Sequence, residues 1–134
     1  MATNSQEYAA LKIVVIDDMP MIRKMLVRQL SQIGIRAVFE ASDAQTGLNA
    51  VIRNRPNLVL CDIHMKESTG FEFLKSLREV TTDKVSETPV IFVTADSELS
   101  TVRTAIKLQP NGYLIKPITI EILEERIRLV LQLD

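Results

Sequence analysis

Residues 13–20, IVVIDDMP, place two adjacent aspartates directly after four apolar residues. The run over residues 11–16 is not polar on alternate positions, which is typical of a strand buried on both faces of a parallel sheet. Asp17 and Asp18 then stand side by side where this strand ends. Like charges at the edge of a core cost stability unless a positive group lies between them. The stretch therefore predicts a buried strand whose end carries two acids in need of a cation.

Four further apolar runs follow, separated by longer segments with helical spacing. The predicted later strands are residues 35–41, 57–61, 89–94 and 112–115. The predicted helices are residues 20–33, 42–54, 69–80, 97–108 and 118–133. Gly34 is a natural stop for the first helix, in which Met21 and Met25 are expected in the core, and Ser42 or Asp43 is expected to cap the second. This (βα)5 alternation predicts an α/β fold, a doubly wound five-stranded parallel sheet with helices on both faces.

Composition narrows the class of protein. The 134 residues, 46% hydrophobic and 25% charged, suit one domain over residues 11–134 after a short, loosely held arm at residues 1–10. The formal net charge of −1 predicts neither nucleic-acid binding nor attraction to a membrane. No secretory leader or membrane span is recognisable, and with Cys61 the single cysteine we expect a cytoplasmic protein without disulfides. One His and one Cys exclude a His/Cys metal site, so any metal is expected to be a hard ion held by oxygens.

Polar side chains follow four of the predicted strands. Asp17 and Asp18 follow the first, Asp62 the third, Thr94 the fourth and Lys116 the fifth. Each alone is most often a turn, cap or strand-end residue, but the carboxyl ends of doubly wound strands form the usual ligand site. Mg²⁺ would relieve the repulsion among three carboxylates, and lysine and threonine suit phosphoryl oxygens. Because a carboxylate can be the nucleophile, the set predicts phosphoryl transfer that gives an acyl phosphate.

Four segments together resemble a known family. They are VIDD (residues 15–18), LVLCDIHM (58–65) with Gly70 downstream, VIFVTA (90–95) and GYLIKP (112–117). The chain resembles the receiver domain of two-component response regulators, especially the single-domain chemotaxis type, over residues 11–133. The resemblance implies the CheY-like, flavodoxin-like sheet order 2-1-3-4-5. It also implies phosphorelay signalling, in which a sensor histidine kinase, a phosphotransfer protein or a small donor such as acetyl phosphate supplies the phosphoryl group. Such a domain is a signalling module that assists its own phosphoryl uptake and hydrolysis, not an enzyme.

The resemblance also implies roles for the residues at the strand ends. Asp62 would be the phosphoacceptor. Asp18 and Asp62 would bind Mg²⁺, or Mn²⁺ or Ca²⁺ in its place, through their side chains. Asp17 would act mainly through water, and the His64 backbone carbonyl would be a further ligand. Lys116 would pair with the phosphoryl group.

The remaining implied roles concern the switch and the lifetime of the phosphoryl group. The bond from Lys116 to Pro117 is expected to be cis. Thr94 would move toward the phosphoryl oxygen and Tyr113 would rotate inward. That change would repack the surface of the fourth helix, fifth strand and fifth helix, where a downstream protein target would bind. His64 and Asp96, two residues beyond Asp62 and Thr94, are expected to tune hydrolysis of the acyl phosphate.

The sequence departs from the family pattern in several places, among them a slightly long loop at residues 81–88 (TTDKVSET). Lys66 stands where the family usually has proline, so the loop after Asp62 is expected to be less rigid. Residues 108–111 (LQPN) replace the usual small residues before Gly112, so the end of the fourth helix is expected to differ.

Three alternatives remain open at this point. An aspartate-nucleophile phosphatase would carry a second acid two residues after its nucleophile, but two residues after Asp17 stands Met19. A nucleotide-binding module would need a glycine-rich loop after the first strand, and none of the four glycines lies there. A receiver-like interaction module that is never phosphorylated is disfavoured by the complete set of acids, threonine and lysine.

Overall fold

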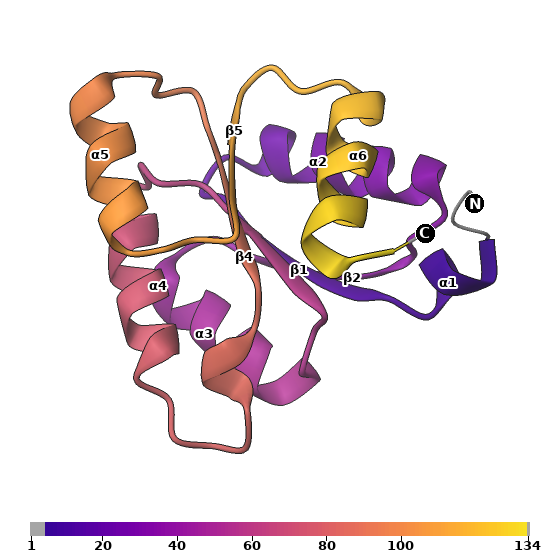
Figure 1. The fold of residues 1–134 in the computed structure, drawn as a ribbon, viewed down its shortest axis with the longest axis horizontal. Helices are drawn as coiled ribbons and strands as arrows, with labels where there is room; N and C mark the ends of the chain where they lie inside the picture. Colours follow the sequence, from indigo (N-terminus) through magenta and orange to yellow (C-terminus); the bar gives the residue numbers. More distant parts are fainter. Residues whose placement is uncertain (1–4, 134) are drawn as a thin grey trace.

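The computed structural model describes residues 5–133 and contains one five-stranded parallel sheet (Figure 1). Its strands are β1 (Lys12–Ile16), β2 (Ala37–Ala41), β3 (Leu58–Cys61), β4 (Val90–Thr94) and β5 (Gly112–Ile115). They pair in parallel in the order β2-β1-β3-β4-β5. The predicted fold class and strand order are therefore confirmed, with strand ends shifted by no more than two residues.

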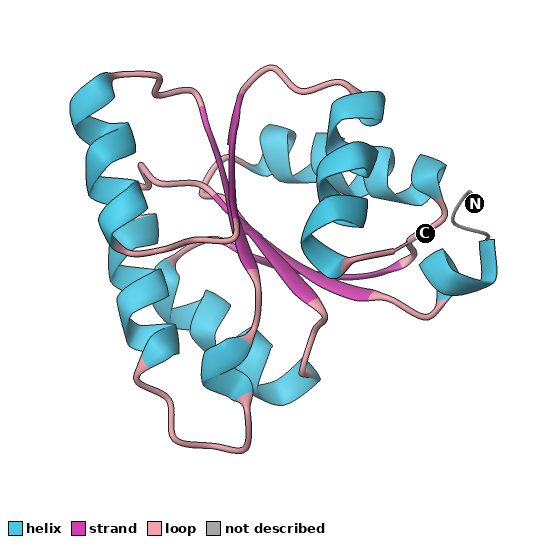
Figure 2. Ribbon diagram, viewed as in Figure 1, coloured by secondary structure: helices cyan, strands magenta, loops and turns pink. Residues whose placement is uncertain are grey.

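Helices cover both faces of the sheet (Figures 1 and 2). They are α1 (Ser5–Ala9), α2 (Pro20–Ile33), α3 (Ala44–Asn54), α4 (Gly70–Arg78), α5 (Leu99–Lys107) and α6 (Ile120–Leu131), with a 3-10 turn, η1 (Val85–Glu87), before β4. Helices α2 and α6 lie on one face, and α3, α4 and α5 on the other. Asp43, one of the two predicted caps, accepts a hydrogen bond from the Thr46 amide at 2.8 Å, which satisfies a donor at the start of α3.

Apart from Lys12 at the start of β1 and Thr94 at the end of β4, the three central strands are apolar, which fits burial of both of their faces. In β1, Ile13 and Val15 belong to the core under α2 and α6, whereas Val14 and Ile16 belong to the core under α3 and α4. Each fully buried side chain of this kind stabilises the fold by roughly 1.5–3 kcal/mol. The prediction that Met21 lies in the core is wrong. Met21 is 80% exposed, in the first turn of α2.

The N-terminal segment differs from the loosely held arm that its polar composition predicts. Residues 5–9 form α1, and Tyr8 within it is only 4% exposed. The Tyr8 hydroxyl donates a hydrogen bond to the Glu124 carboxylate of α6, and its ring packs on Gly34 at the end of α2. Gly34 has φ of +117°, a conformation that favours glycine. Tyr8 thus helps to hold this segment on the core, while residues 1–4 of the predicted arm lie outside the described part.

Within residues 5–133, no helix has the length and apolar character that crossing a membrane requires.

Candidate functional site

The carboxyl ends of four strands bring together the five polar residues that the sequence analysis singled out. The carboxyl-end rim, as we call it, consists of Asp17, Asp18, Asp62, Thr94 and Lys116. Register explains their proximity. Ile16 of β1 lies opposite Cys61 of β3, and the Asp62 amide donates to the Ile16 carbonyl at 2.9 Å. The Lys116 amide likewise donates to the Thr94 carbonyl at 2.8 Å, so the ends of β4 and β5 are held side by side.

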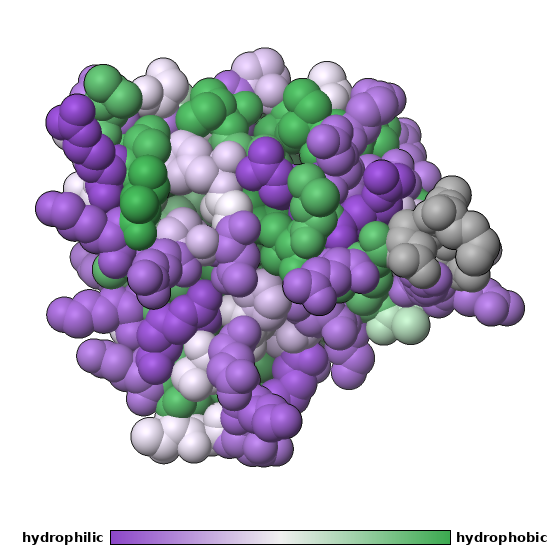
Figure 3. Space-filling model, viewed as in Figure 1, coloured by the Kyte–Doolittle hydropathy of each residue, from purple (hydrophilic) through white to green (hydrophobic). Residues whose placement is uncertain are grey.

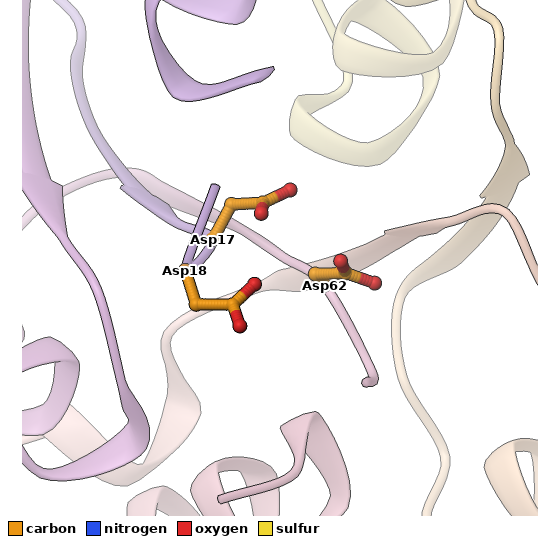
Figure 4. A group of neighbouring side chains, drawn as sticks. All are labelled: Asp17, Asp18 and Asp62. Atoms are coloured by element: carbon orange, nitrogen blue, oxygen red, sulfur yellow. The ribbon is translucent and has the colours of Figure 1, made fainter. Parts of the chain in front are cut away.

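The three aspartates form a compact group of oxygen ligands. One carboxylate oxygen from each of Asp17, Asp18 and Asp62 lies within 4.8 Å of the other two. Asp17 and Asp18 leave the end of β1 in different directions, and Asp62 lies beside them at the end of β3 (Figure 4). Asp17 is 1% exposed and Asp62 8% exposed. A divalent ion that prefers oxygen, such as Mg²⁺, fits this donor set.

Lys116 places one positive charge between two of the three aspartates, Asp17 and Asp62. Its Nζ lies 2.7 Å from Asp17 Oδ2 and 3.2 Å from Asp62 Oδ2. Burial nevertheless raises the pKa of Asp17 above its ordinary value, and repulsion from Asp62 adds to this increase. The hydrogen bonds from Lys116 and the Met19 amide lower the pKa but do not cancel the effect of burial. One ammonium therefore does not fully offset the cost of burying these carboxylates. The remaining negative excess favours a further cation.

Asp62 is held closely by the segment that follows it. Its Oδ1 accepts a hydrogen bond from the Ile63 amide at 2.7 Å. A Cβ atom on Gly70 would overlap the Asp62 carbonyl oxygen, so α4 can begin this close to Asp62 only with glycine there. The neighbouring Cys61 is fully buried, and burial raises the pKa of its thiol above the ordinary range, which keeps it protonated and unreactive.

Lys66 contributes to the site through its backbone. The Lys66 amide donates to Asp18 Oδ2 at 2.8 Å, which a proline at this position could not do. Two residues later, Ser68 Oγ accepts a hydrogen bond from the Ala44 amide at 2.9 Å and thereby joins the loop to the start of α3. The departure from the family pattern thus supplies a contact that orients one of the acids.

A cavity of about 690 Å³ opens onto Asp62. The polar part of its wall includes His64, Thr94, Asp96 and Lys116, and the apolar part includes Met19, Ile22, Met25 and Pro117. Although Asp62 is largely buried, a reactant can therefore reach it from this side. Figure 3, which views the molecule as Figure 1 does, shows apolar groups interrupted by polar ones over its upper half.

His64 and Asp96 meet at the wall of this cavity. His64 Nε2 lies 2.6 Å from Asp96 Oδ2. Hydrogen bonds from the Glu98 amide, His64 and Thr101 lower the pKa of Asp96. Their positions two residues beyond Asp62 and Thr94 placed both near the site, but nothing in the sequence indicated that they contact each other. Thr101, on α5, was missed because a single threonine in a polar helix carries no signal.

The chain after β5 is fixed by a contact with α2, which lies on the same face of the sheet. The Lys116–Pro117 peptide bond is cis. The next carbonyl, that of Ile118, accepts a hydrogen bond from Gln29 Nε2 of α2 at 2.8 Å. Sequence reasoning missed Gln29, because a polar residue in an amphipathic helix is usually solvated.

Comparisons with known proteins agree with this geometry. Residues 13–128 match the family model described as response regulator receiver domain. The chain is 39% identical over 121 residues to the probable transcriptional regulator ycf27 of Porphyridium aerugineum, covering 90% of this chain and 48% of that protein. It is 27% identical to the chemotaxis protein CheY of Pseudomonas aeruginosa, covering 91% of this chain and 97% of that protein. The structure of chemotaxis protein CheY4 of Vibrio cholerae superposes with a TM-score of 0.80 at 26% identity, over 90% of this chain and 98% of that one.

The chain thus spans about half the length of the ycf27 relative and nearly all of the chemotaxis relatives. The family match covers the strands that supply all the acids, the threonine and the lysine of the carboxyl-end rim. This protein belongs to the family of response regulator receiver domains, which are signalling modules of two-component systems and not enzymes in the usual sense.

Proposed function

We propose that this protein is a phosphorelay receiver in which Asp62 accepts a phosphoryl group from a sensor histidine kinase, a phosphotransfer protein or a small donor such as acetyl phosphate. One observation carries the proposal. Asp62 lies at the open cavity with two further acids and Lys116 within reach. A carboxylate so placed has a nucleophilic oxygen, a route of approach and positive charge beside it.

The acids would hold Mg²⁺, with Mn²⁺ or Ca²⁺ able to replace it. Asp18 and Asp62 would bind through their side chains, the His64 backbone carbonyl would add a ligand, and Asp17 would act mainly through water. The spacing of the three carboxylates and the raised pKa of Asp17 both support a cation here. When bound, the cation supplies positive charge for the acids and for the phosphoryl oxygens.

The transfer step forms one bond and breaks one bond. An Asp62 carboxylate oxygen bonds to phosphorus as the bond from phosphorus to the imidazole nitrogen of a phosphohistidine, or to the acyl oxygen of acetyl phosphate, breaks. The bonding electron pair leaves with the donor. Lys116, now shared between Asp17 and Asp62, would bond to a phosphoryl oxygen.

The phosphoryl group would leave by hydrolysis. A water oxygen attacks phosphorus, the bond from phosphorus to Asp62 breaks, and the Asp62 carboxylate and inorganic phosphate result. His64 and Asp96, which line the cavity on the approach to Asp62, would tune this rate.

A downstream protein would bind the face formed by α5, β5 and α6, which are the predicted fourth helix, fifth strand and fifth helix. Thr94 would move toward the phosphoryl group and Tyr113 inward, and the face would repack for a downstream protein target. Support comes from apolar side chains that this face exposes to solvent. They are Leu99, Ile106, Ile115 and Ile122.

The test is incubation with Mg²⁺ and acetyl phosphate, followed by intact-mass measurement. We expect a gain of about 80 Da, the mass of one phosphoryl group, which chelation of Mg²⁺ prevents. Asp62→Asn should abolish the gain, whereas Asp83→Asn, in the loop before η1, should retain it. A folded protein that gains no mass would instead be an unphosphorylated interaction module. Steady turnover of a phosphate monoester without a stable gain would indicate a phosphatase.

A further inference from the structure

The peptide group that joins Asp17 to Asp18 is held by an arginine that is not part of the carboxyl-end rim. Arg23 Nη1 donates a hydrogen bond to the Asp17 backbone carbonyl at 2.7 Å. Because a peptide group is planar, fixing this carbonyl also fixes the direction in which the chain enters Asp18. Arg23 lies in α2 with its side chain 16% exposed, so the bond is largely shielded from water.

The orientation of this peptide group matters because the two carboxylates leave β1 in different directions (Figure 4). Even so, one oxygen from each of Asp17, Asp18 and Asp62 lies within 4.8 Å of the other two. A rotation of the peptide group would turn the Asp17 and Asp18 side chains relative to each other. The bond from Arg23 therefore helps to decide whether both acids can serve one ion.

The end of β2 in turn holds Arg23. Glu40 Oε1 lies 3.2 Å from Arg23 Nε, and the Asp17 amide donates to the Ala41 carbonyl at 3.1 Å. Strand β2 supplies no side chain to the carboxyl-end rim as defined above. Through Glu40 and Arg23 it nevertheless contacts the backbone between the two acids.

Arginine suits this place because its planar guanidinium can donate in two directions at once. Nη1 bonds to the Asp17 carbonyl while Nε faces Glu40. The next residue, Lys24, offers a contrast. Its Nζ lies 3.1 Å from Glu40 Oε2, and in the described part of the chain this is its one side-chain bond. Lys24 thus shares a partner with Arg23 but does not contact Asp17.

We propose that Arg23 is a positioning residue for the metal site, which holds the Asp17–Asp18 peptide group so that both carboxylates face one Mg²⁺. The proposal rests on the proposed function, since it concerns the cation of the same site. The effect it predicts is opposite in sign to that of charge. Removing a positive group near a cation site strengthens cation binding by electrostatics alone, whereas losing a contact that orients the ligands weakens it.

The variant is Arg23→Met, and Lys24→Met is the matched control. Each removes one positive charge beside Glu40 from the same turn of α2, but only the first removes the bond to Asp17. Titration calorimetry with Mg²⁺ should show binding about tenfold weaker in Arg23→Met. Lys24→Met should bind Mg²⁺ as the parent does or slightly more tightly.

A second variant, Glu40→Gln, tests the same contact in a protein that keeps Arg23. Its effect on Mg²⁺ affinity is measured in the parent and in the Arg23→Met background. If Glu40 acts through Arg23, Glu40→Gln should weaken Mg²⁺ binding more in the parent than in Arg23→Met. A charge that acts independently would weaken binding equally in both, which would contradict the proposal.

Phosphoryl uptake at graded Mg²⁺ concentrations separates positioning from loss of stability. Arg23→Met should need about tenfold more Mg²⁺ for the half-maximal rate of mass gain with acetyl phosphate. At saturating Mg²⁺ the rate should stay within about twofold of the parent, since Asp62 and Lys116 are unchanged. A variant that is merely destabilised would lose rate at every Mg²⁺ concentration.

Unchanged or tighter Mg²⁺ binding in Arg23→Met would overturn the proposal, and so would equal weakening in Lys24→Met. Failure of the proposed function looks different. In that case the parent binds Mg²⁺ but gains no mass with acetyl phosphate, and the calorimetric comparison still decides the role of Arg23. A parent that binds no Mg²⁺ would overturn both.

Discussion

At each end of the sheet a cationic side chain lies among oxygen atoms, but the oxygens are charged at one end and neutral at the other. At the carboxyl-end rim, Lys116 lies among acids that outnumber it. At the amino-end rim, which we define as the residues before β4 and β5 together with Arg78, the guanidinium meets only neutral oxygens. Arg78 donates to the Ser86 and Thr88 carbonyls at 3.0 and 2.7 Å and to Asn111 Oδ1 at 3.2 Å.

The two rims differ in whether their polar groups are already satisfied. Asn111 Oδ1 also accepts the Val90 amide at 2.9 Å, so the amino-end rim joins α4, η1, β4 and β5 through satisfied hydrogen bonds. Its cation is partly desolvated, and burial lowers the pKa of Arg78. The carboxyl-end rim keeps an excess of negative charge and an open cavity. One end of the sheet therefore fixes the fold, while the other is prepared to bind.

The largest expected effect is on the rate of phosphoryl uptake, which should depend on the carboxyl-end rim and not on the amino-end rim. Lys116→Met should slow phosphoryl uptake from acetyl phosphate by about a hundredfold or more, because the positive group on the developing charge is lost. Arg78→Met should leave that rate within about twofold, since the rim it joins is remote from the acceptor. The rate of intact-mass gain measures both. Equal slowing in the two variants would contradict a functional division between the rims.

The next effect concerns stability. Arg78→Met should lower the free energy of unfolding in urea by about 2 kcal/mol, because the Ser86 and Thr88 carbonyls lose their charged donor. The matched control is Arg55→Met. Arg55 is exposed and donates to the Asp83 carbonyl at 3.2 Å in the same loop, so its loss should cost less than about 1 kcal/mol. Similar losses for both arginines would show that Arg78 is no more than a surface contact.

A smaller effect should reverse sign with the cation. The pKa of Asp17 is raised above its ordinary value of 3.8, so the fold favours the protonated form. The stability that protonation gives is present below the ordinary value and lost as pH rises through the folded-state pKa. Asp17→Asn should therefore raise the melting temperature at neutral pH in chelator by about 3 °C, and the difference should shrink as pH falls. Saturating Mg²⁺ should reverse it. A variant less stable in chelator would mean that the bond to Lys116 outweighs burial.

The smallest effect concerns the loop after Asp62. Lys66→Pro removes the amide that orients Asp18 and should weaken Mg²⁺ binding by about twofold to threefold, whereas Lys66→Ala keeps the amide and should bind as the parent does. Titration calorimetry with Mg²⁺ measures both variants. If the alanine variant weakens binding equally, the contribution comes from the ammonium group and not from the backbone.

The ends of the strands could be predicted from the sequence, because strands buried on both faces appear in it as continuous apolar runs. Continuous apolar runs marked the central strands, and the residue after each run had to lie at the rim, as Asp17 and Asp62 do. The contacts that complete each rim leave no such pattern. Arg78 reaches Asn111 across 33 positions of sequence, and both read as ordinary polar residues at element ends. The prediction of a loosely held arm at residues 1–10 missed the burial of Tyr8, because one aromatic residue among polar neighbours does not form a recognisable apolar run.

The burial of Tyr8 bears on how this protein is to be dissected. The family match begins at residue 13, yet the folded unit begins earlier, because the ring of Tyr8 fills a place in the core between α2 and α6. A fragment started at Leu11 would leave that place empty, and loss of a buried aromatic side chain typically costs about 3–5 kcal/mol. Such a fragment would keep every residue of the phosphorylation site and lose much of the stability that holds them in position. Phosphorylation measured on such a fragment would therefore reflect its lower stability as well as the chemistry of the site.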